Sequence, residues 1–251
     1  KRQGMNCLAI HRPDIAFAVE EAGREMSKPA LGGWVRLKRI GRYLSHRPRL
    51  TLEYLWQPMP KQVHIYTDAG WAGCTRSRKS TSGGCIVLGK HSLKSWSTTQ
   101  SFIALSFGES EFYAAVKASA EGSGMIAMLR DFGVTVSGRV LGDASAALGI
   151  IHRKGVGRIR HIHTVLLWIQ QTAAEKRLVY EKVLGAENQE DLLTKYLIAE
   201  IIDRPCTCSL LQTPRPKETI RQLNWVSIFC RWQKLVTSLK LAALSDGDRH
   251  A

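Results

Sequence analysis

The sequence is poor in acidic residues and has no long apolar run. Of its 251 residues, 21 are Asp or Glu against 36 Lys or Arg. No apolar stretch approaches the length of a membrane span, and no signal peptide is visible. The six cysteines are scattered, and the one close pair, Cys206 and Cys208, lacks the second pair or the histidines of a zinc site. These absences argue against a membrane protein, a zinc protein and a disulfide-stapled secreted protein, so we expect reduced, intracellular thiols.

The shortage of acids leaves a formal net charge of +15. A field of that sign attracts polyanions, of which nucleic acid is the commonest. Composition alone is equally compatible with a basic protein that is merely soluble. The chain begins at Lys1 rather than at a methionine, which suggests a piece of a longer protein.

Three zones differ in their hydrophobic pattern. Residues 1–57 have helical spacing, with Pro13 suited to the first turn of one helix and a second helix expected over 32–44. Prolines then mark a linker. Residues 60–198 alternate between strand and helix patterns, and residues 199–251 form a poorly defined C-terminal extension with an amphipathic stretch at 225–244.

The middle zone predicts an α/β domain. Strands are expected at 63–67, 83–88, 93–98, 139–141 and 178–184. A long helix follows the third strand, and shorter helices are expected from 144, over 162–175 and from 188. This order implies a mixed sheet covered by helices.

Four carboxylates stand at the ends of these strands or in the first turns of the helices: Asp68, Glu111, Asp143 and Asp191. If the first and fourth strands are neighbours, Asp68 and Asp143 emerge at one edge of the sheet. Small residues continue the helical face of Glu111, so that helix could lie close to the sheet. Converging acids repel each other unless cations lie between them. Hard oxygen ligands suit Mg²⁺ or Mn²⁺, and two ions about 4 Å apart would support phosphodiester cleavage.

Each acid also has a structural explanation. Asp191 could close a capping box begun by Asn188, and Asp143 could cap the helix expected from residue 144. Both alternatives stay open at this point. Glu109 is different, because Ser106 and Glu109 form a capping-box pattern on the far side of the helix from Glu111. We therefore assign Glu109 to structure.

A set of motifs resembles copia-type ribonuclease H domains in order and spacing. They are residues 66–73 (YTDAGWAG), 78–84 (RKSTSGG), 95–97 (SWS), 109–115 (ESEFYAA), 142–146, 160–162 (RHI) and 190–195 (EDLLTK). Residues 12–15 and 34–44 resemble the stretch where such polyproteins pass from reverse transcriptase into ribonuclease H.

The resemblance implies a ribonuclease H-like fold: a five-stranded mixed sheet flanked by helices, here with a helical N-terminal extension. By family pattern the metal-binding acids are matched by Asp68, Glu111, Asp143 and Asp191. Two departures stand out, because Ala144 occupies a position that is usually asparagine and His163 one that is usually acidic.

Further candidates surround these acids. His161 could shuttle a proton or touch the leaving phosphate, although a histidine at a helix start is more often structural. Two loops could contact phosphates or could simply be charged, solvated surface. They contain Arg76, Arg78 and Lys79 in one and Arg153, Lys154, Arg158 and Arg160 in the other. Trp71 and Trp96 are expected in the core rather than on a base.

The sequence therefore predicts a metal-dependent endonuclease that cuts the RNA strand of RNA–DNA hybrids during retrotransposon reverse transcription. Expected partners are the hybrid and the reverse transcriptase part of the same polyprotein, in a cytoplasmic virus-like particle or the nucleus. One alternative is a catalytically decayed, nucleic-acid-binding remnant of such a polyprotein. Another is an integrase- or resolvase-like nuclease.

Overall fold

The computed structural model describes residues 2–25, 31–50, 52, 54–157, 159–184 and 191–196, without the side chains of residues 2–6 and 191. The chain divides into two compact units, Lys1–Pro214 and Arg215–Ala251. The second unit and the predicted C-terminal extension, residues 199–251, lie outside the described residues. The zone boundaries predicted from the sequence therefore stay predictions.

The core of the first unit is a five-stranded sheet with the order β3-β2-β1-β4-β5. Its strands are β1 (Gln62–Gly70), β2 (Thr81–Leu88), β3 (His91–Thr99), β4 (Ser137–Gly142) and β5 (Leu178–Lys182). The pairs β1–β2 and β2–β3 are antiparallel, whereas β1–β4 and β4–β5 are parallel. This confirms the predicted ribonuclease H-like α/β fold.

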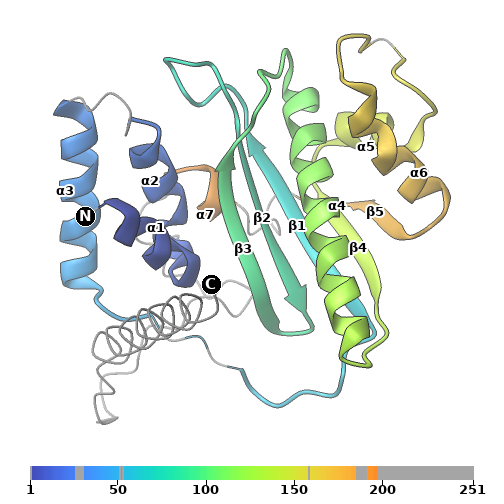
Figure 1. Cartoon of the computed structure of the whole chain (residues 1–251), viewed down its shortest axis with the longest axis horizontal. Helices are drawn as coiled ribbons and strands as arrows, with labels where there is room; N and C mark the ends of the chain where they lie inside the picture. The colour runs from blue at the N-terminus through green and yellow to red at the C-terminus, as the bar shows by residue number, and fades with distance from the viewer. Residues whose placement is uncertain are drawn as a thin grey trace, which may run out of the picture. The chain divides into compact units, whose positions relative to one another are not determined.

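One face of the sheet carries the main hydrophobic core. The helix α4 (Phe107–Asp131) lies along it, with α5 (Ser145–His152) and α6 (Trp168–Ala174) beside it (Figure 1). Val63 and Ile65 of β1 pack with Phe112 of α4, and all three are fully buried. The Ser106 hydroxyl accepts a hydrogen bond from the Glu109 backbone N–H at 3.2 Å, which confirms the predicted N-cap of α4.

The other face is covered by α2 (Pro13–Gly23) and by α7 (Asp191–Thr194). In Figure 1, α7 lies between α2 and the strands. A smaller apolar cluster holds the layers together, with Ala16 from α2, Cys85 and Val87 from β2, and Leu193 from α7. Successive residues of a strand point to opposite faces, so odd positions of β2 face α7 and even positions face α4.

Polar contacts also fasten α2 to the antiparallel strands. The Glu20 carboxylate accepts hydrogen bonds from the backbone N–H and the hydroxyl of Thr99, at 2.8 and 2.6 Å. Arg24 donates to the Thr99 hydroxyl at 2.9 Å and to the Thr81 hydroxyl at 2.6 Å. The N-terminal helical region thus contacts the sheet directly.

The N-terminal helices are α1 (Arg2–His11), α2 and α3 (Leu31–His46). Pro13 stands at the start of α2, as predicted. Ile15 and Val19 of α2 pack against Ile40 of α3. A buried ion pair joins Arg12 to Asp14 at 2.7 Å. No helix among the described residues is both long and apolar enough to cross a membrane.

Some elements differ from the prediction. β1 continues to Gly70, so Asp68 lies inside the strand rather than after it. The helix expected over 162–175 is split into a short 3₁₀ helix, η1 (Thr164–Leu167), followed by α6. The described part of the last helix begins at Asp191, and residues 185–190 lie outside the description.

Candidate metal centre and nucleic-acid interface

Three of the four predicted acids come together at one point. One carboxylate oxygen from each of Asp68, Glu111 and Asp143 lies within 4.8 Å of the other two. Asp68 and Glu111 are buried, with 4% and 3% of their surface exposed. The paired register of β1 and β4 ends at Tyr66 and Leu141, so Asp68 and Asp143 follow where the two strands part. Neighbouring parallel strands thus deliver both aspartates, as the sequence suggested.

Glu111 reaches this point because α4 lies very close to the sheet. A Cβ atom at Gly122 would lie 2.4 Å from the Ile65 side chain, so glycine is needed there. The Ala69 backbone N–H donates to Glu111 Oε1 at 3.2 Å. Burial raises the pKa of Glu111 to about 9, with help from the charges of Asp68 and Asp143. Burial and the two neighbouring carboxylates thus both disfavour a charged Glu111, and a cation bound among the three acids would offset that cost.

Asp143 does not cap a helix. The N-cap of α5 is Ala144, which makes no side-chain capping hydrogen bond. Asp143 Oδ1 is buried and has no hydrogen-bond partner among the described residues. Such an orphaned buried oxygen is costly unless a ligand satisfies it. The capping alternative for Asp143 is therefore wrong, and its chemistry fits a cation ligand.

Asp191 is the first residue of α7, and its side chain lies outside the described residues. Asn188, its alternative capping partner, also lies outside them, so the choice between ligand and cap stays a prediction. The same segment contributes two residues that the sequence analysis missed. Thr194 donates a hydrogen bond to Asp68 Oδ2, and the charge of Lys195 offsets a small part of the rise in the pKa of Glu111. Their positions three and four residues after Asp191, which share a helical face, were an available signal.

His161 contacts Glu109, the residue that the sequence analysis assigned a structural role. Glu109 Oε1 lies 3.0 Å from His161 Nε2 and accepts a hydrogen bond from the Tyr113 hydroxyl at 2.7 Å. The other oxygen of Glu109 accepts from the Leu105 backbone N–H at 3.0 Å. Glu109 therefore fastens the start of α4 and fixes the His161 ring, which stays 47% exposed.

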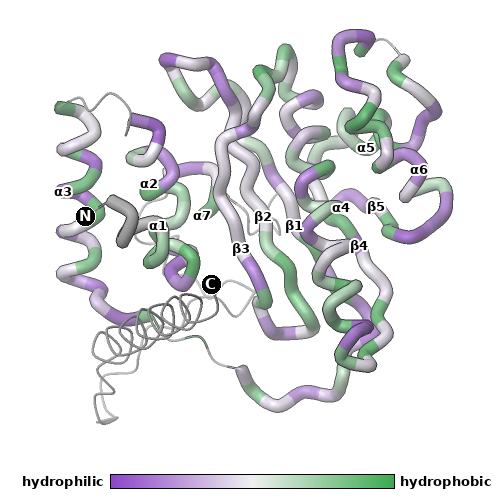
Figure 2. Tube along the Cα trace, viewed as in Figure 1, coloured by the Kyte–Doolittle hydropathy of each residue, from purple (hydrophilic) through white to green (hydrophobic). Residues whose placement is uncertain are grey.

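The two basic loops differ in what their side chains do. Arg76 and Arg78 are exposed and Lys79 is half-buried in the loop between β1 and β2, which is mainly hydrophilic in Figure 2. Arg153 instead donates to the Val156 carbonyl within its own loop, where its guanidinium covers Gly157. In that second loop Lys154 and Arg160 are exposed, and Arg158 lies outside the described residues.

The two tryptophans also differ. Trp96 is buried in the main core, as expected. Trp71 is 47% exposed, so its predicted core position is wrong. Its indole N–H donates to the Ala104 carbonyl at 3.1 Å, which holds the ring at the surface.

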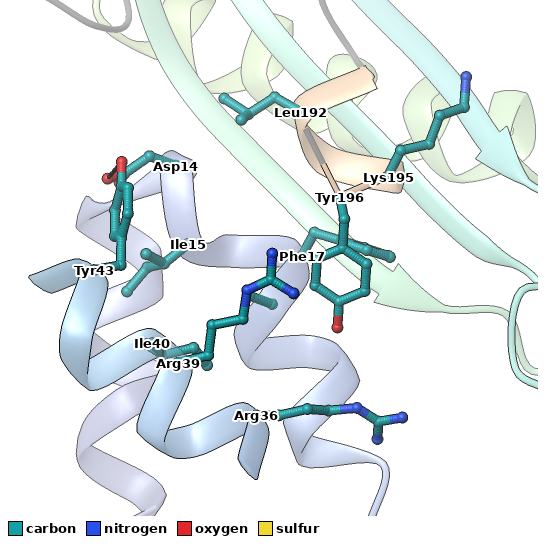
Figure 3. Close-up of a pocket in the computed structure, with 11 residues that line it drawn as sticks. Asp14, Ile15, Phe17, Arg36, Arg39, Ile40, Tyr43, Leu192, Lys195 and Tyr196 are labelled. Atoms are coloured by element: carbon teal, nitrogen blue, oxygen red, sulfur yellow. Dashed lines mark hydrogen bonds between the residues drawn. The ribbon is translucent and has the colours of Figure 1, made fainter. Parts of the chain in front are cut away.

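A separate pocket of about 370 Å³ lies between α2, α3 and α7. Ile15, Ile40 and Leu192 supply apolar wall, and the Tyr196 ring meets Phe17 edge-on at 4.9 Å between centroids. Figure 3 shows Lys195 extending away from the Tyr196 ring. None of the three clustered acids lines this pocket.

Sequence comparison finds relatives among the polyproteins of plant transposons. The chain is 32% identical over 130 residues to the retrovirus-related Pol polyprotein from transposon RE2 of Arabidopsis thaliana. It is 29% identical over 194 residues, 76% of its length, to the corresponding polyprotein from transposon TNT 1-94 of Nicotiana tabacum. Its homologues are therefore retrovirus-related Pol polyproteins of plant transposons. The predicted resemblance is thereby confirmed.

The matched residues span only 9% of the RE2 polyprotein and 14% of the TNT 1-94 polyprotein. A shorter relative, named secreted RxLR effector protein 161 of Plasmopara viticola, is 37% identical over 117 residues, which are 82% of that protein and 47% of this chain. No family model matches the chain. Among solved structures, LC11-RNase H1 from compost is similar at 19% identity and a TM-score of 0.38, covering 53% of this chain and 93% of its own.

Proposed function

We propose that this chain is a metal-dependent endonuclease that cuts the RNA strand of RNA–DNA hybrids during reverse transcription. One observation carries the proposal: Asp68, Glu111 and Asp143 gather within 4.8 Å in a chain of net charge +15. A protein that only bound a polyanion would gain nothing from gathering negative charge. The transposon Pol homologues and the α/β fold support a nuclease in general, and the proposal adds the substrate and the metal.

The acids fit a pair of hard cations such as Mg²⁺ or Mn²⁺, held by Asp68, Glu111 and Asp143, with Asp191 as the proposed fourth ligand. Such ions, when bound, activate a water and stabilise the oxygen that departs from the scissile phosphate. The buried, orphaned oxygen of Asp143 supports this donor set. In a hybrid only the RNA strand carries 2′-hydroxyls, which gives the site a way to select it.

The remaining residues have binding or proton-handling roles in this proposal. The exposed cations Arg76, Arg78, Lys154 and Arg160 would contact phosphates, with Lys79 and the undescribed Arg158 as further candidates. His161, fixed by Glu109, would carry a proton near the leaving group. Arg153 is the weakest of the proposed contacts because its guanidinium already serves its own loop. The partners proposed are the hybrid and the polymerase part of the polyprotein, inside a virus-like particle or the nucleus.

The test compares wild type with Asp68→Asn on labelled hybrid and on duplex DNA, with Mg²⁺ and then with EDTA. We expect hybrid cleavage that EDTA abolishes, and a fall of at least about 100-fold in rate for the variant, since a metal ligand is lost. Cleavage of duplex DNA but not of hybrid would favour the integrase-like alternative. Binding of hybrid without cleavage would favour the decayed remnant. Equal rates for the two proteins would reject the site.

A further inference from the structure

We propose that Thr194 is a positioning residue of the metal centre: its hydroxyl holds the Asp68 carboxylate in the orientation that receives a divalent cation. The inference rests on the proposed function and adds a residue from α7 to it. Thr194 would act through Asp68 and would not itself touch the ion or the substrate.

The contact is buried and connects distant parts of the chain. Thr194 is 4% exposed and Asp68 is equally buried. The Thr194 hydroxyl donates to Asp68 Oδ2, across 126 positions of sequence. Within the acid cluster, the carboxylates of Glu111 and Asp143 repel the Asp68 carboxylate. A hydrogen bond from a neutral donor restrains one carboxylate oxygen at no cost in added charge, and the carboxylate still has lone pairs for a cation.

The sheet is shaped to admit this threonine. Gly83 of β2 is paired with Asp68 of β1 in the antiparallel register, so both face α7. A Cβ atom at Gly83 would lie 2.6 Å from Thr194 Cγ2 and 2.9 Å from Leu193 Cβ. A Cβ atom at Gly70 would lie 3.1 Å from the Thr194 carbonyl oxygen. Two glycines therefore provide the space in which the end of α7 rests.

Both branches of the Thr194 side chain are used. Its methyl group lies against Gly83, while its hydroxyl faces Asp68. A β-branched side chain has few χ1 rotamers, so contact of the methyl group also fixes the direction of the hydroxyl. Serine would keep the donor but lose the packing, and valine would keep the shape but lose the donor. This separates positioning from packing in an experiment.

α7 is in turn supported by the N-terminal helix α2. Ala16 of α2 and Leu193 of α7 share one apolar cluster. The Phe17 and Tyr196 rings meet edge-on just beyond α7. The position of Thr194 therefore depends on packing that lies outside the acid cluster.

The test measures Mn²⁺ affinity of the full chain by calorimetry and by electron paramagnetic resonance, without substrate. We expect Thr194→Val to weaken binding by about 10- to 100-fold, the usual effect of removing a hydrogen bond that orients a ligand. Thr194→Ser is expected to stay within about 3-fold of wild type, since the donor remains. In hybrid cleavage, Thr194→Val should need more Mg²⁺ for half-maximal rate while the KM for hybrid stays unchanged.

The matched control is Thr172→Val. Thr172 is equally buried, with 1% exposed, and its hydroxyl donates to the Trp168 carbonyl inside α6 at 3.1 Å. We expect this variant to lose some stability and to keep wild-type Mn²⁺ affinity. If Thr194→Val and Thr172→Val weakened Mn²⁺ binding equally, or if Thr194→Val bound as wild type does, the inference would be overturned. Should Thr194→Val fail to fold, Thr194→Ala tests the same loss of the donor with less bulk.

Failure of this inference can be told from failure of the proposed function. If Asp68→Asn loses Mn²⁺ and Thr194→Val does not, only the role of Thr194 is rejected. If wild type and Asp68→Asn bind Mn²⁺ equally, the metal centre itself is rejected.

Discussion

The two faces of the sheet are built in different ways. On the α4 face, large apolar side chains such as Phe112 and Ile65 are fully buried in one continuous core. On the α2 and α7 face, the apolar cluster is small and polar contacts from Glu20 and Arg24 do much of the fastening. The acid cluster lies where the faces meet, with Glu111 from one and Thr194 from the other. We infer that packing on the α4 face contributes most of the free energy of unfolding. Packing on the α2 and α7 face instead positions the side chains of the acid cluster.

The largest loss of stability should come from removing a large side chain from the core under α4. Phe112→Ala is expected to lower the free energy of unfolding by about 3–5 kcal/mol, because it removes a fully buried ring. Leu193→Ala on the other face should cost about 2–3 kcal/mol. Urea unfolding measures both. A larger loss for Leu193→Ala than for Phe112→Ala would reverse the comparison.

Substitutions at two adjacent glycines of β2 test the two faces separately, because Gly83 faces α7 and Gly84 faces the Trp96 ring. Gly84→Ala would place a Cβ atom 2.1 Å from the Trp96 ring, whereas Gly83→Ala would meet Thr194 and Leu193. Each should cost about 1–3 kcal/mol through overpacking. Only Gly83→Ala should also weaken Mn²⁺ binding, because it displaces α7. Calorimetry with Mn²⁺ separates them, and equal weakening in the two would count against distinct roles for the faces.

The polar fastening of α2 should matter less. Glu20→Ala removes the acceptor of two hydrogen bonds from Thr99, one of them from a backbone N–H. We expect a loss of about 1–2 kcal/mol by thermal melting, since that N–H loses its partner. Glu20→Gln keeps an acceptor and is the control. A loss as large for Gln as for Ala would mean that charge, rather than hydrogen bonding, secures α2.

The smallest effect is expected from a surface pair on the α4 side. Lys94 and Glu121 lie 2.6 Å apart with side chains 44% and 28% exposed. Lys94→Ala should change stability by less than about 0.5 kcal/mol, because solvent and salt screen such pairs. Thermal melting at low and high salt checks this. A loss above 1 kcal/mol would show that the strand edge contributes more than its exposure suggests.

Much of the site could be predicted because strand ends and helical faces are local signals. The alternation of apolar and polar residues before Asp68 predicts that its carboxylate lies at the edge of the sheet. The small residues that follow Glu111 predict that its helix lies close to that sheet. The helical spacing from Asp191 could point to Thr194, but its contact with Asp68 could not be predicted, since that contact depends on which β2 residue stands opposite Asp68. The partnership of Glu109 with His161 links positions 52 residues apart. The capping-box pattern explained Glu109 from neighbouring residues alone. Its contact with His161 could be seen only in the folded chain.

The exposure of Trp71 was also beyond the sequence. An aromatic residue after a strand is usually packed inside, and the hydrogen bond to the Ala104 carbonyl, which the loop before α4 brings near, holds this ring at the surface. The break between η1 and α6 could not be predicted from the sequence either. Helical spacing over 162–175 does not distinguish one continuous helix from a 3₁₀ turn joined to a shorter one.

The bond from Thr194 to Asp68 has a consequence for synthesis. A ribosome produces the two residues 126 positions apart, and the β1 strand and α4 emerge long before α7. A nascent or prematurely terminated polypeptide that ends before α7 therefore carries Asp68, Glu111 and Asp143 but lacks this threonine. Competence to bind metal tightly would then arise late in translation.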